Sequence, residues 1–337
     1  MSITITPFDA AKHLDTAAEL LADRHRRDRK RDPRLPANFD NKSDCRGQIE
    51  NALNATGWYG VLAESGGKPA GFGIMAPQFI EPTNMLASFF PPRGASITYS
   101  GYAAREGMEY DVYREVYAAL ADEFVRRGIF DHAINVSATD AVTVDTFNSL
   151  GFGRTLACAV RGIDPVDRKA AAVDVHQASA EDYPVIEALG EELTLHHAKS
   201  PIFNPFIRES DPASHEFIKG LLNDPDGNAH WIGYDNGRAI GMNTFMQPFF
   251  LSPLTIPDRT IYLFLGVVTA DARMGGVGSA ILSQGVAWAR EKGYKNVALH
   301  FATANLSGAR FWQISGFKPI DYGMRRHIDE RIAWANK

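Results

Sequence analysis

A glycine-rich segment in the second half of the chain has the residue types and spacing of an anion site. Residues 261–268 are almost wholly apolar, as in a strand covered on both faces, and residues 269–278 lead from them into a helical pattern. Backbone N–H groups in such a turn, with those at a helix N-terminus, form a concave set of donors. Glycines leave the backbone open to a phosphate, and Arg273 adds a cationic donor. The segment therefore predicts a phosphate-binding loop.

Two common phosphate-binding loops do not fit this spacing. A Walker loop needs a Lys directly after its last glycine, and Ser279 follows Gly278 here. A dinucleotide fingerprint opens near the first strand of its domain, whereas this loop comes late. The ligand must therefore be a phosphate compound of another class.

Two motifs in register resemble those of the GCN5-related N-acetyltransferase (GNAT) superfamily. The first is Arg-x-x-Gly-x-Gly, and the second is an Asn followed by an aromatic residue and a Gly-Phe pair. Their residues here are Arg273, Gly276, Gly278, Asn305, Trp312, Gly316 and Phe317. The resemblance implies that acetyl-coenzyme A is the co-substrate, with its pantetheine arm between two splayed strands and its pyrophosphate on the loop. The cofactor-binding residues that it implies are Gly266, Val267, Val268, Arg273, Met274, Gly275, Gly276, Val277, Gly278, Ser279, Asn305 and Trp312.

The resemblance also implies that an acceptor amine attacks the thioester directly, so the enzyme mainly orients the reactants and manages protons. The family often places a tyrosine acid at the position of Trp312, which has no acidic proton to give, and Tyr322 is the substitute candidate. One branch of the family has a glutamate base where Tyr262 stands. His300, on the following strand, has an ordinary pKa better suited to proton transfer. Tyr262, His300 and Tyr322 are the candidate catalytic residues. The alternative for Tyr262 is core packing, and that for His300 is a half-buried strand residue hydrogen-bonded to backbone.

The acceptor is expected to be a primary amine of a small molecule. Acceptor contacts in the family come from the first helices, the loop before the fourth strand and the final strands. The residues in the first two of these regions include Glu191, Glu192, His196, His197, Phe203, Phe206, Arg208, Phe249 and Phe250. Carboxylates attract an ammonium group and aromatic rings can wall its pocket, but no residue alone identifies the amine.

The two halves of the chain repeat each other at a separation of 165 residues. In this register Gly128 falls on Gly293, Gly151-Phe152 on Gly316-Phe317, and Arg161-x-Ile163-Asp164 on Arg326-x-Ile328-Asp329. The repeat predicts two tandem GNAT-like domains, residues 1–165 and 172–337. Each is expected to be α+β, with a central mixed, mostly antiparallel sheet flanked by helices. In the second domain, periodicity predicts strands at 173–177, 229–234, 239–246, 261–268 and 297–301, one or two between 317 and 328, and helices at 180–195, 278–292 and 307–315.

The first half of the chain lacks an equivalent of the glycine-rich loop. In the repeat register Arg273 falls on Met108, Gly276 on Asp111 and Gly278 on Tyr113. Carboxylates repel a pyrophosphate, and side chains block its close approach to the backbone. The first domain is therefore expected not to bind coenzyme A, and to serve structure or to shape the acceptor pocket.

Composition narrows the class of protein. The net charge of −5 gives no general reason to bind nucleic acid, and no apolar run is long enough for a membrane span. Two cysteines far apart, Cys45 and Cys158, predict neither a disulfide framework nor a metal site. A basic run at residues 23–34 has both signs interspersed, which favours a solvated helix end over a site for an acidic ligand. No secretory signal is visible, so a cytoplasmic monomer or homodimer is expected.

Two other functions stay open at this level. The missing tyrosine at position 312 keeps a non-catalytic acyl-coenzyme A binding protein in view. A Fem-type aminoacyl transfer protein with duplicated domains is less favoured, because the cofactor loop is intact and the chain is acidic. A transferase acting on a small amine is the leading prediction.

Overall fold

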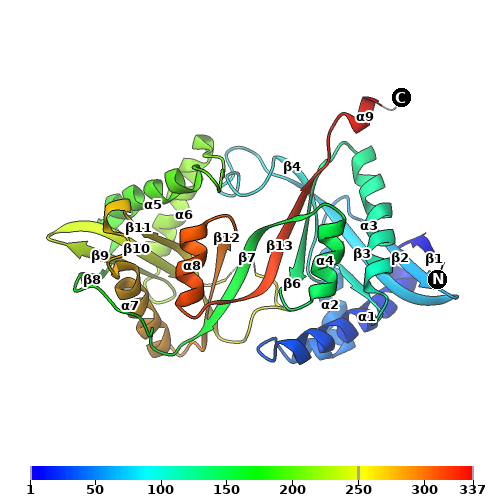
Figure 1. Ribbon diagram of the computed structural model, residues 1–337, viewed down its shortest axis with the longest axis horizontal. Coiled ribbons are helices and arrows are strands. Elements are labelled where there is room, and N and C mark those ends of the chain that lie inside the picture. Colours follow the sequence, from blue (N-terminus) through cyan, green and yellow to red (C-terminus); the bar gives the residue numbers. More distant parts are fainter. Residues whose placement is uncertain (1, 249–250, 336–337) are drawn as a thin grey trace.

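The computed structural model describes residues 2–248 and 251–335 and shows an elongated molecule of two α+β lobes (Figure 1). The first lobe is built from β1 (Ile3–Pro7), α1 (Ala10–Arg31), α2 (Lys42–Leu53), β2 (Tyr59–Ser65), β3 (Lys68–Phe79), β4 (Arg93–Ile97), β5 (Tyr102–Ala104), α3 (Glu109–Arg126), β6 (Asp131–Ser137), α4 (Ala141–Ser149) and β7 (Gly153–Gly162). The second contains β8 (Asp174–Gln177), α5 (Tyr183–His197), α6 (Asp211–Leu222), β9 (Ala229–Asp235), β10 (Arg238–Met246), β11 (Thr260–Val268), α7 (Val277–Glu291), β12 (Asn296–Ala302), α8 (Leu306–Ile314), β13 (Lys318–His327) and α9 (Ile332–Ala335).

One continuous sheet runs through both lobes. Its strands lie in the order β1-β2-β3-β4-β6-β13-β7-β12-β11-β10-β9-β8, and β5 pairs with β3 beside this path. The pairs β4–β6 and β11–β12 are parallel, and the other pairs are antiparallel. The predicted mixed, mostly antiparallel sheet flanked by helices is confirmed.

The repeat at 165 residues is visible in the elements themselves. Helix α4 and helix α8 begin and end at equivalent positions, and so do β6 and β12, and β7 and β13. Each short helix is capped by the side chain before it, since Asp140 accepts from the N–H of Thr143 and Asn305 from that of Gly308. The same local sequence signals therefore produce the same local structure twice.

The two lobes exchange their last strands. Strand β7, from the first half, pairs with β12 of the second, while β13 pairs with β6 of the first. Strands β7 and β13 also pair with each other, so they form the middle of the sheet (Figure 1). No local pattern in the sequence predicts this exchange. Because of it, each lobe depends on a strand from the other half of the chain.

Helices cover both faces of the sheet in the second lobe. Apolar side chains of α7 and α8 pack on one face around Phe245, Leu263 and Phe317. Helix α6 packs on the opposite face near Met246 and Tyr262. The sequence predicted the other main helices of this lobe but missed α6 and joined the short 3-10 turn at Ala180–Asp182 to the start of α5.

The basic run at residues 23–34 is a solvated helix end only in part, because Asp23, Arg26, Lys30 and Arg31 are exposed while other charges of the run are buried. Arg24 is only 2% exposed, and its guanidinium donates to the carbonyls of Tyr99 and Tyr102. Asp28 is buried beside it and accepts a hydrogen bond from the hydroxyl of Tyr99. These charges are compensated inside the first lobe, which the sequence pattern alone could not show.

Candidate active site

The glycine-rich loop connects β11 to α7, as the sequence predicted. After a short 3-10 turn at Ala270–Ala272, Arg273 is extended and Met274 and Gly276 have positive φ. Gly276 has a φ of 93° and is the N-cap of α7. A Cβ atom there would lie 2.8 Å from the carbonyl oxygen of Lys169, so glycine is required both by φ and by the linker passing beside the loop.

The backbone donors of this loop point away from internal partners. Among the described residues, none accepts a hydrogen bond from the N–H groups of residues 273–279. The side chain of Arg273 folds back, and its Nε donates to the carbonyl of Val268 at 3.0 Å. Met274 is fully exposed and does not fill the turn. The loop therefore keeps a free set of N–H donors at the N-terminus of α7, where the helix dipole favours an anion.

Beside the loop, strands β11 and β12 diverge and leave a gap in the pairing of the sheet. Strands β11 and β12 pair only from Thr260 to Tyr262 and from Asn296 to Ala298. Beyond Tyr262, β11 remains paired with β10 as far as Val268, so its other edge is free of β12. The backbone of residues 263–268 can therefore pair with an extended ligand between the strands.

Gly266 on β11 lies under the indole of α8. A Cβ atom on Gly266 would lie 2.8 Å from the ring of Trp312, so the glycine makes room for the indole. Asn243, its neighbour on β10, is 4% exposed, and its Nδ2 has no partner among the described residues. A buried amide donor without an acceptor is costly. The unpaired edge of β11 and the free loop donors are the features that fit an acyl-coenzyme A thioester.

Asn305 and Trp312 lie at the same end of the lobe, on α8. The Oδ1 of Asn305 caps the helix, and its Nδ2 lies 3.4 Å from Nε2 of His197 at the end of α5. Burial lowers the pKa of His197 to about 4, so this imidazole is neutral at pH 7 and can accept from the amide. Trp312 packs on Phe311 and Phe317 as well as over Gly266.

Two candidate catalytic residues lie together where the strands begin to diverge. The hydroxyl of Tyr262 lies 2.9 Å from Nδ1 of His300, which bridges β11 and β12 across the gap. Burial lowers the pKa of His300 to about 4 and raises the pKa of Tyr262 well above its usual value. Both side chains are therefore neutral at pH 7 and form one polar pair in an apolar setting.

Two further residues join this pair that the sequence did not single out. Cys158 on β7 and Asp321 on β13 each place a polar atom within 4.8 Å of His300. Asp321 accepts from Thr255 Oγ1 at 3.1 Å, and burial raises its pKa to about 7. The exchange of β7 and β13 brings these groups together, so no local motif could have revealed them.

A thiol, an imidazole and a carboxyl are also a donor set that zinc accepts. In this structure Asp321 is hydrogen-bonded to Thr255 and Asn135, and His300 is bonded to Tyr262. These hydrogen bonds engage the carboxyl and Nδ1 of the imidazole without an ion. That the chain holds no metal stays a prediction.

The structure does not bring Tyr322 to this pair. Successive residues of a strand face opposite sides, and Asp321 already faces the side of His300 and Thr255. Tyr322 packs on the α8 side, with the guanidinium of Arg154 4.6 Å from its ring centre.

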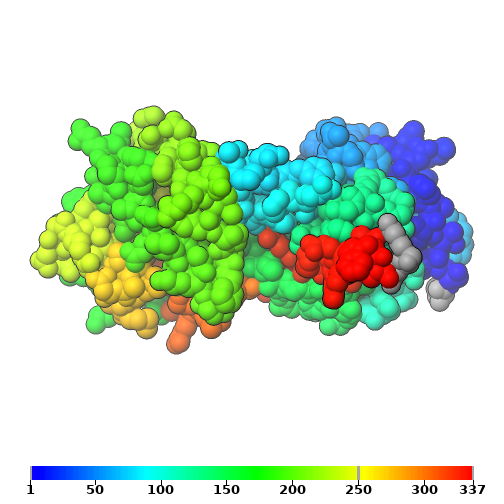
Figure 2. All heavy atoms as spheres, turned by 90° about the horizontal axis from the view of Figure 1, so that it is seen from above, coloured from blue at the N-terminus to red at the C-terminus, as the bar shows by residue number. Residues whose placement is uncertain are grey.

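Part of the segment expected near the acceptor lies against the first lobe. The stretch between α5 and α6 touches that lobe, since the N–H of Ile207 donates to the Ser88 hydroxyl, and Figure 2 shows these segments side by side. Arg208 lies over the ring of Phe206 and 4.0 Å from Glu191. The described members of the set, on α5 and in the segment after it, are Glu191, Glu192, His196, His197, Phe203, Phe206 and Arg208. Phe249 and Phe250 lie outside the described residues.

One of these residues contacts the loop rather than the acceptor side. Glu192 accepts a hydrogen bond from the N–H of Ala270 at 3.0 Å. This carboxylate ties α5 to the turn that precedes the free donors.

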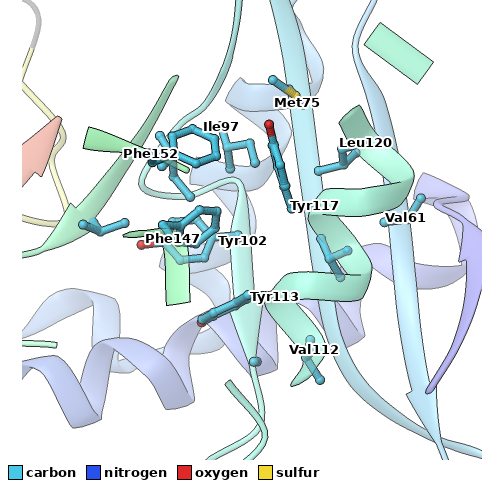
Figure 3. Close-up of a cluster of buried hydrophobic side chains, with 14 of the residues drawn as sticks. Val61, Met75, Ile97, Tyr102, Val112, Tyr113, Tyr117, Leu120, Phe147 and Phe152 are labelled. Carbon is cyan, nitrogen blue, oxygen red and sulfur yellow. The ribbon is translucent and has the colours of Figure 1, made fainter. Parts of the chain in front are cut away.

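The equivalent region of the first lobe is filled by its own side chains. Helix α3 begins at Glu109, so the residues in register with the loop form its first turn. Tyr102 reaches across from β5 and donates to the carbonyl of Asn135 on β6, in the gap that stays open in the second lobe. Figure 3 shows the rings of Tyr102, Tyr113 and Phe147 grouped there, with ring centres 5.3 to 6.4 Å apart.

Comparison with known proteins agrees with this geometry. Residues 193–317 match the model of the acetyltransferase (GNAT) family. A 92-residue stretch is 26% identical to human N-acetyltransferase 8, covering 27% of this chain and 39% of that protein. The chain thus spans well under half the length of this curated relative.

Two solved structures share the fold over nearly the whole chain. A GCN5-related N-acetyltransferase from Sphaerobacter thermophilus superposes with a TM-score of 0.55 at 14% identity, covering 97% of each chain. A tandem GNAT protein from the clavulanic acid biosynthesis pathway gives 0.51 at 13% identity, covering 97% of this chain and 98% of that one. Within the described residues, no helix combines the length and apolar character needed to cross a bilayer.

Proposed function

Because residues 193–317 form a GNAT-family domain within a tandem GNAT fold, we propose that the protein transfers an acetyl group from acetyl-coenzyme A to a primary amine of a small molecule. The observation that carries the proposal is the free set of N–H donors at residues 273–279, at the start of α7. A pyrophosphate at this point would accept several of these hydrogen bonds and interact with the helix dipole.

The thioester arm would lie in the gap between the diverging parts of β11 and β12. The open edge of β11 at Gly266, Val267 and Val268 can pair with the amides of an extended pantetheine, as an added strand would. The acyl carbon would then be directed along the gap towards Tyr262 and His300.

In the proposed reaction the amine nitrogen attacks the thioester carbonyl, a C–N bond forms, and the C–S bond breaks to release the thiolate. The amine must lose a proton, and the thiolate gains one. Neutral His300, hydrogen-bonded to Tyr262, is placed to accept the amine proton. Its lowered basicity makes it a weak base, so most of the rate enhancement is expected from orientation. Asp321 serves as a positioning residue beside the imidazole.

The first lobe is proposed not to bind coenzyme A. Tyr102 and Tyr113 occupy the gap and the loop position, and Glu109 and Asp111 would place carboxylates beside a phosphate. Its contribution would be the wall of the acceptor site at the junction, together with strand β7.

Release of free thiol in the presence of a panel of primary amines tests the proposed activity. Polyamines, amino sugars and amino acids should be included, with acetyl-coenzyme A alone as the blank. At least one amine class is expected to give turnover with loss of the thioester.

A non-catalytic acyl-coenzyme A binding protein is the second candidate. It is favoured by Trp312, which stands where the family often has its tyrosine acid and whose ring packs over Gly266. Tight binding of acetyl-coenzyme A without turnover on any amine would establish this alternative.

A further inference from the structure

A cavity opens at the junction of the two lobes. It has a volume of about 500 Å³ and lies between the C-terminal end of α1, the end of β7 and the start of β13. This volume falls within the usual range for small-molecule sites. None of its lining residues belongs to the glycine-rich loop or to the gap between β11 and β12.

The charges that line this cavity are unbalanced. Arg31, Arg34, Arg161 and Lys318 face one carboxylate, Asp32. Arg34 is paired with Asp32 at 2.6 Å, and Arg31 pairs with Asp28 at 3.2 Å outside the lining. These two arginines are therefore largely compensated.

The other two cations have no carboxylate within ion-pair distance among the described residues. Arg161 is 7% exposed, and its guanidinium donates only to backbone carbonyls, including those of Ser315 and Asp164. Lys318 is exposed at the start of β13 and has no hydrogen-bond partner in the described part of the chain. Asp164 lies near Arg161, and Lys318 shares Asp32 with Arg34, so these cations have only partial compensation. Such a cluster of cations is a setting that an anion stabilises.

We propose that this cavity binds a small polyanion, in which a phosphate group or a pair of carboxylates meets Lys318 and Arg161. The α1 end comes from the first lobe, whereas Lys318 comes from the second half of the chain. A bound anion would therefore bridge the two halves and raise the stability of the whole protein. This site also gives a role to the basic run at residues 23–34, which supplies Arg31 and Arg34.

The proposal is tested by calorimetric titration of the full chain with pyrophosphate and with citrate at low ionic strength, with matched chloride as the blank. Saturable binding of citrate at one site per chain is expected, and pyrophosphate should bind both here and on the coenzyme A loop. The variant Lys318→Gln should weaken citrate binding about tenfold, because one partly screened charge is removed beside a multiply charged anion. Lys68→Gln removes an exposed lysine at the start of β3, which is not among the lining residues, and should leave citrate binding unchanged.

A second pair of measurements separates this cavity from the coenzyme A loop. Gly275→Asp places a carboxylate in that loop, so it should remove the loop's share of pyrophosphate binding and leave citrate binding within about twofold of the wild type. Binding that Gly275→Asp abolishes and Lys318→Gln leaves intact would show that the anions occupy the loop, and the proposal would be wrong. Failure of both anions to bind saturably at millimolar concentration would also overturn it. If only one of the two anions binds, its identity decides between phosphate and carboxylate ligands.

Discussion

Replacing Asp321 by Asn tests the electrostatics of the polar group at the centre of the sheet. The carboxyl is 5% exposed, and burial raises its pKa from 3.8 to about 7. Asn keeps the size of the side chain and an oxygen that can accept from Thr255, but it cannot ionise. The variant therefore removes the titration with little change in packing.

The size of the effect follows from the two pKa values. Between about pH 4 and 7 the folded protein keeps the proton on Asp321 while the unfolded chain loses it. The contribution of the Asp321 proton to the free energy of unfolding is therefore fully present at low pH. It is lost as the pH rises towards 7, at about 1.4 kcal/mol per pH unit. Between pH 5 and 8 the wild type should lose about 2 to 3 kcal/mol through this group, and Asp321→Asn should not.

Urea unfolding of the two proteins at pH 5, 6, 7 and 8 measures this difference. The free energy of unfolding of Asp321→Asn relative to wild type should increase steadily from pH 5 to 7 and then level off. Asp145→Asn, an exposed change on α4, is the matched control and should show no such trend. Parallel curves for Asp321→Asn and wild type would refute the protonated carboxyl and the reasoning from burial.

Two further predictions concern packing and catalysis. Gly285→Ala on α7 should destabilise the protein by about 1 to 3 kcal/mol, because its Cβ would lie 2.1 Å from the Phe245 ring. In the control Gly220→Ala on α6, the new Cβ meets nothing within 4 Å, and the change should stabilise the protein by about 0.5 to 1 kcal/mol. Equal effects of the two changes in thermal unfolding would contradict this packing. His300→Asn and Tyr262→Phe should each lower kcat by about 10- to 100-fold and leave the KM for acetyl-coenzyme A little changed. The control Tyr110→Phe changes an exposed tyrosine and should leave both constants unchanged. A rise in KM with an unchanged kcat would assign His300 and Tyr262 to binding.

Much of the architecture could be predicted because it depends on local signals that occur twice. The glycines and the Gly-Phe pairs recur in one register in both halves, and the structure has equivalent helices and strands there, with Asp140 and Asn305 as equivalent helix caps. The loop at residues 269–278 was recognisable for the same reason. Its apolar strand, glycines and following helix are adjacent in sequence.

The features that could not be predicted depend on contacts between distant segments. The exchange of β7 and β13 leaves the local patterns of both strands unchanged, because each still has the same kind of neighbour. Asp321 reads as an ordinary polar residue until this exchange buries it beside His300. The sequence pattern likewise predicts an exposed Arg24, whereas in the fold the carbonyls of Tyr99 and Tyr102 accept its hydrogen bonds.

The choice of variant matters for testing the loop. Asp at Gly276 would add charge, but it would also strain a backbone with φ 93° and clash with the linker. Gly275 has ordinary φ, and a Cβ atom there would meet only the carbonyl of Ala272 at 3.8 Å. Gly275→Asp therefore adds charge without distortion, and Gly275→Asn is its neutral counterpart.

Calorimetric titration of acetyl-coenzyme A into the wild type and these two variants tests the central claim most directly. One site per chain is expected, weakened at least tenfold by Gly275→Asp through repulsion of the diphosphate and changed by no more than about threefold by Gly275→Asn. Two equivalent sites, or equal affinity in the Asp variant and the wild type, would contradict a diphosphate held by the backbone donors at the start of α7.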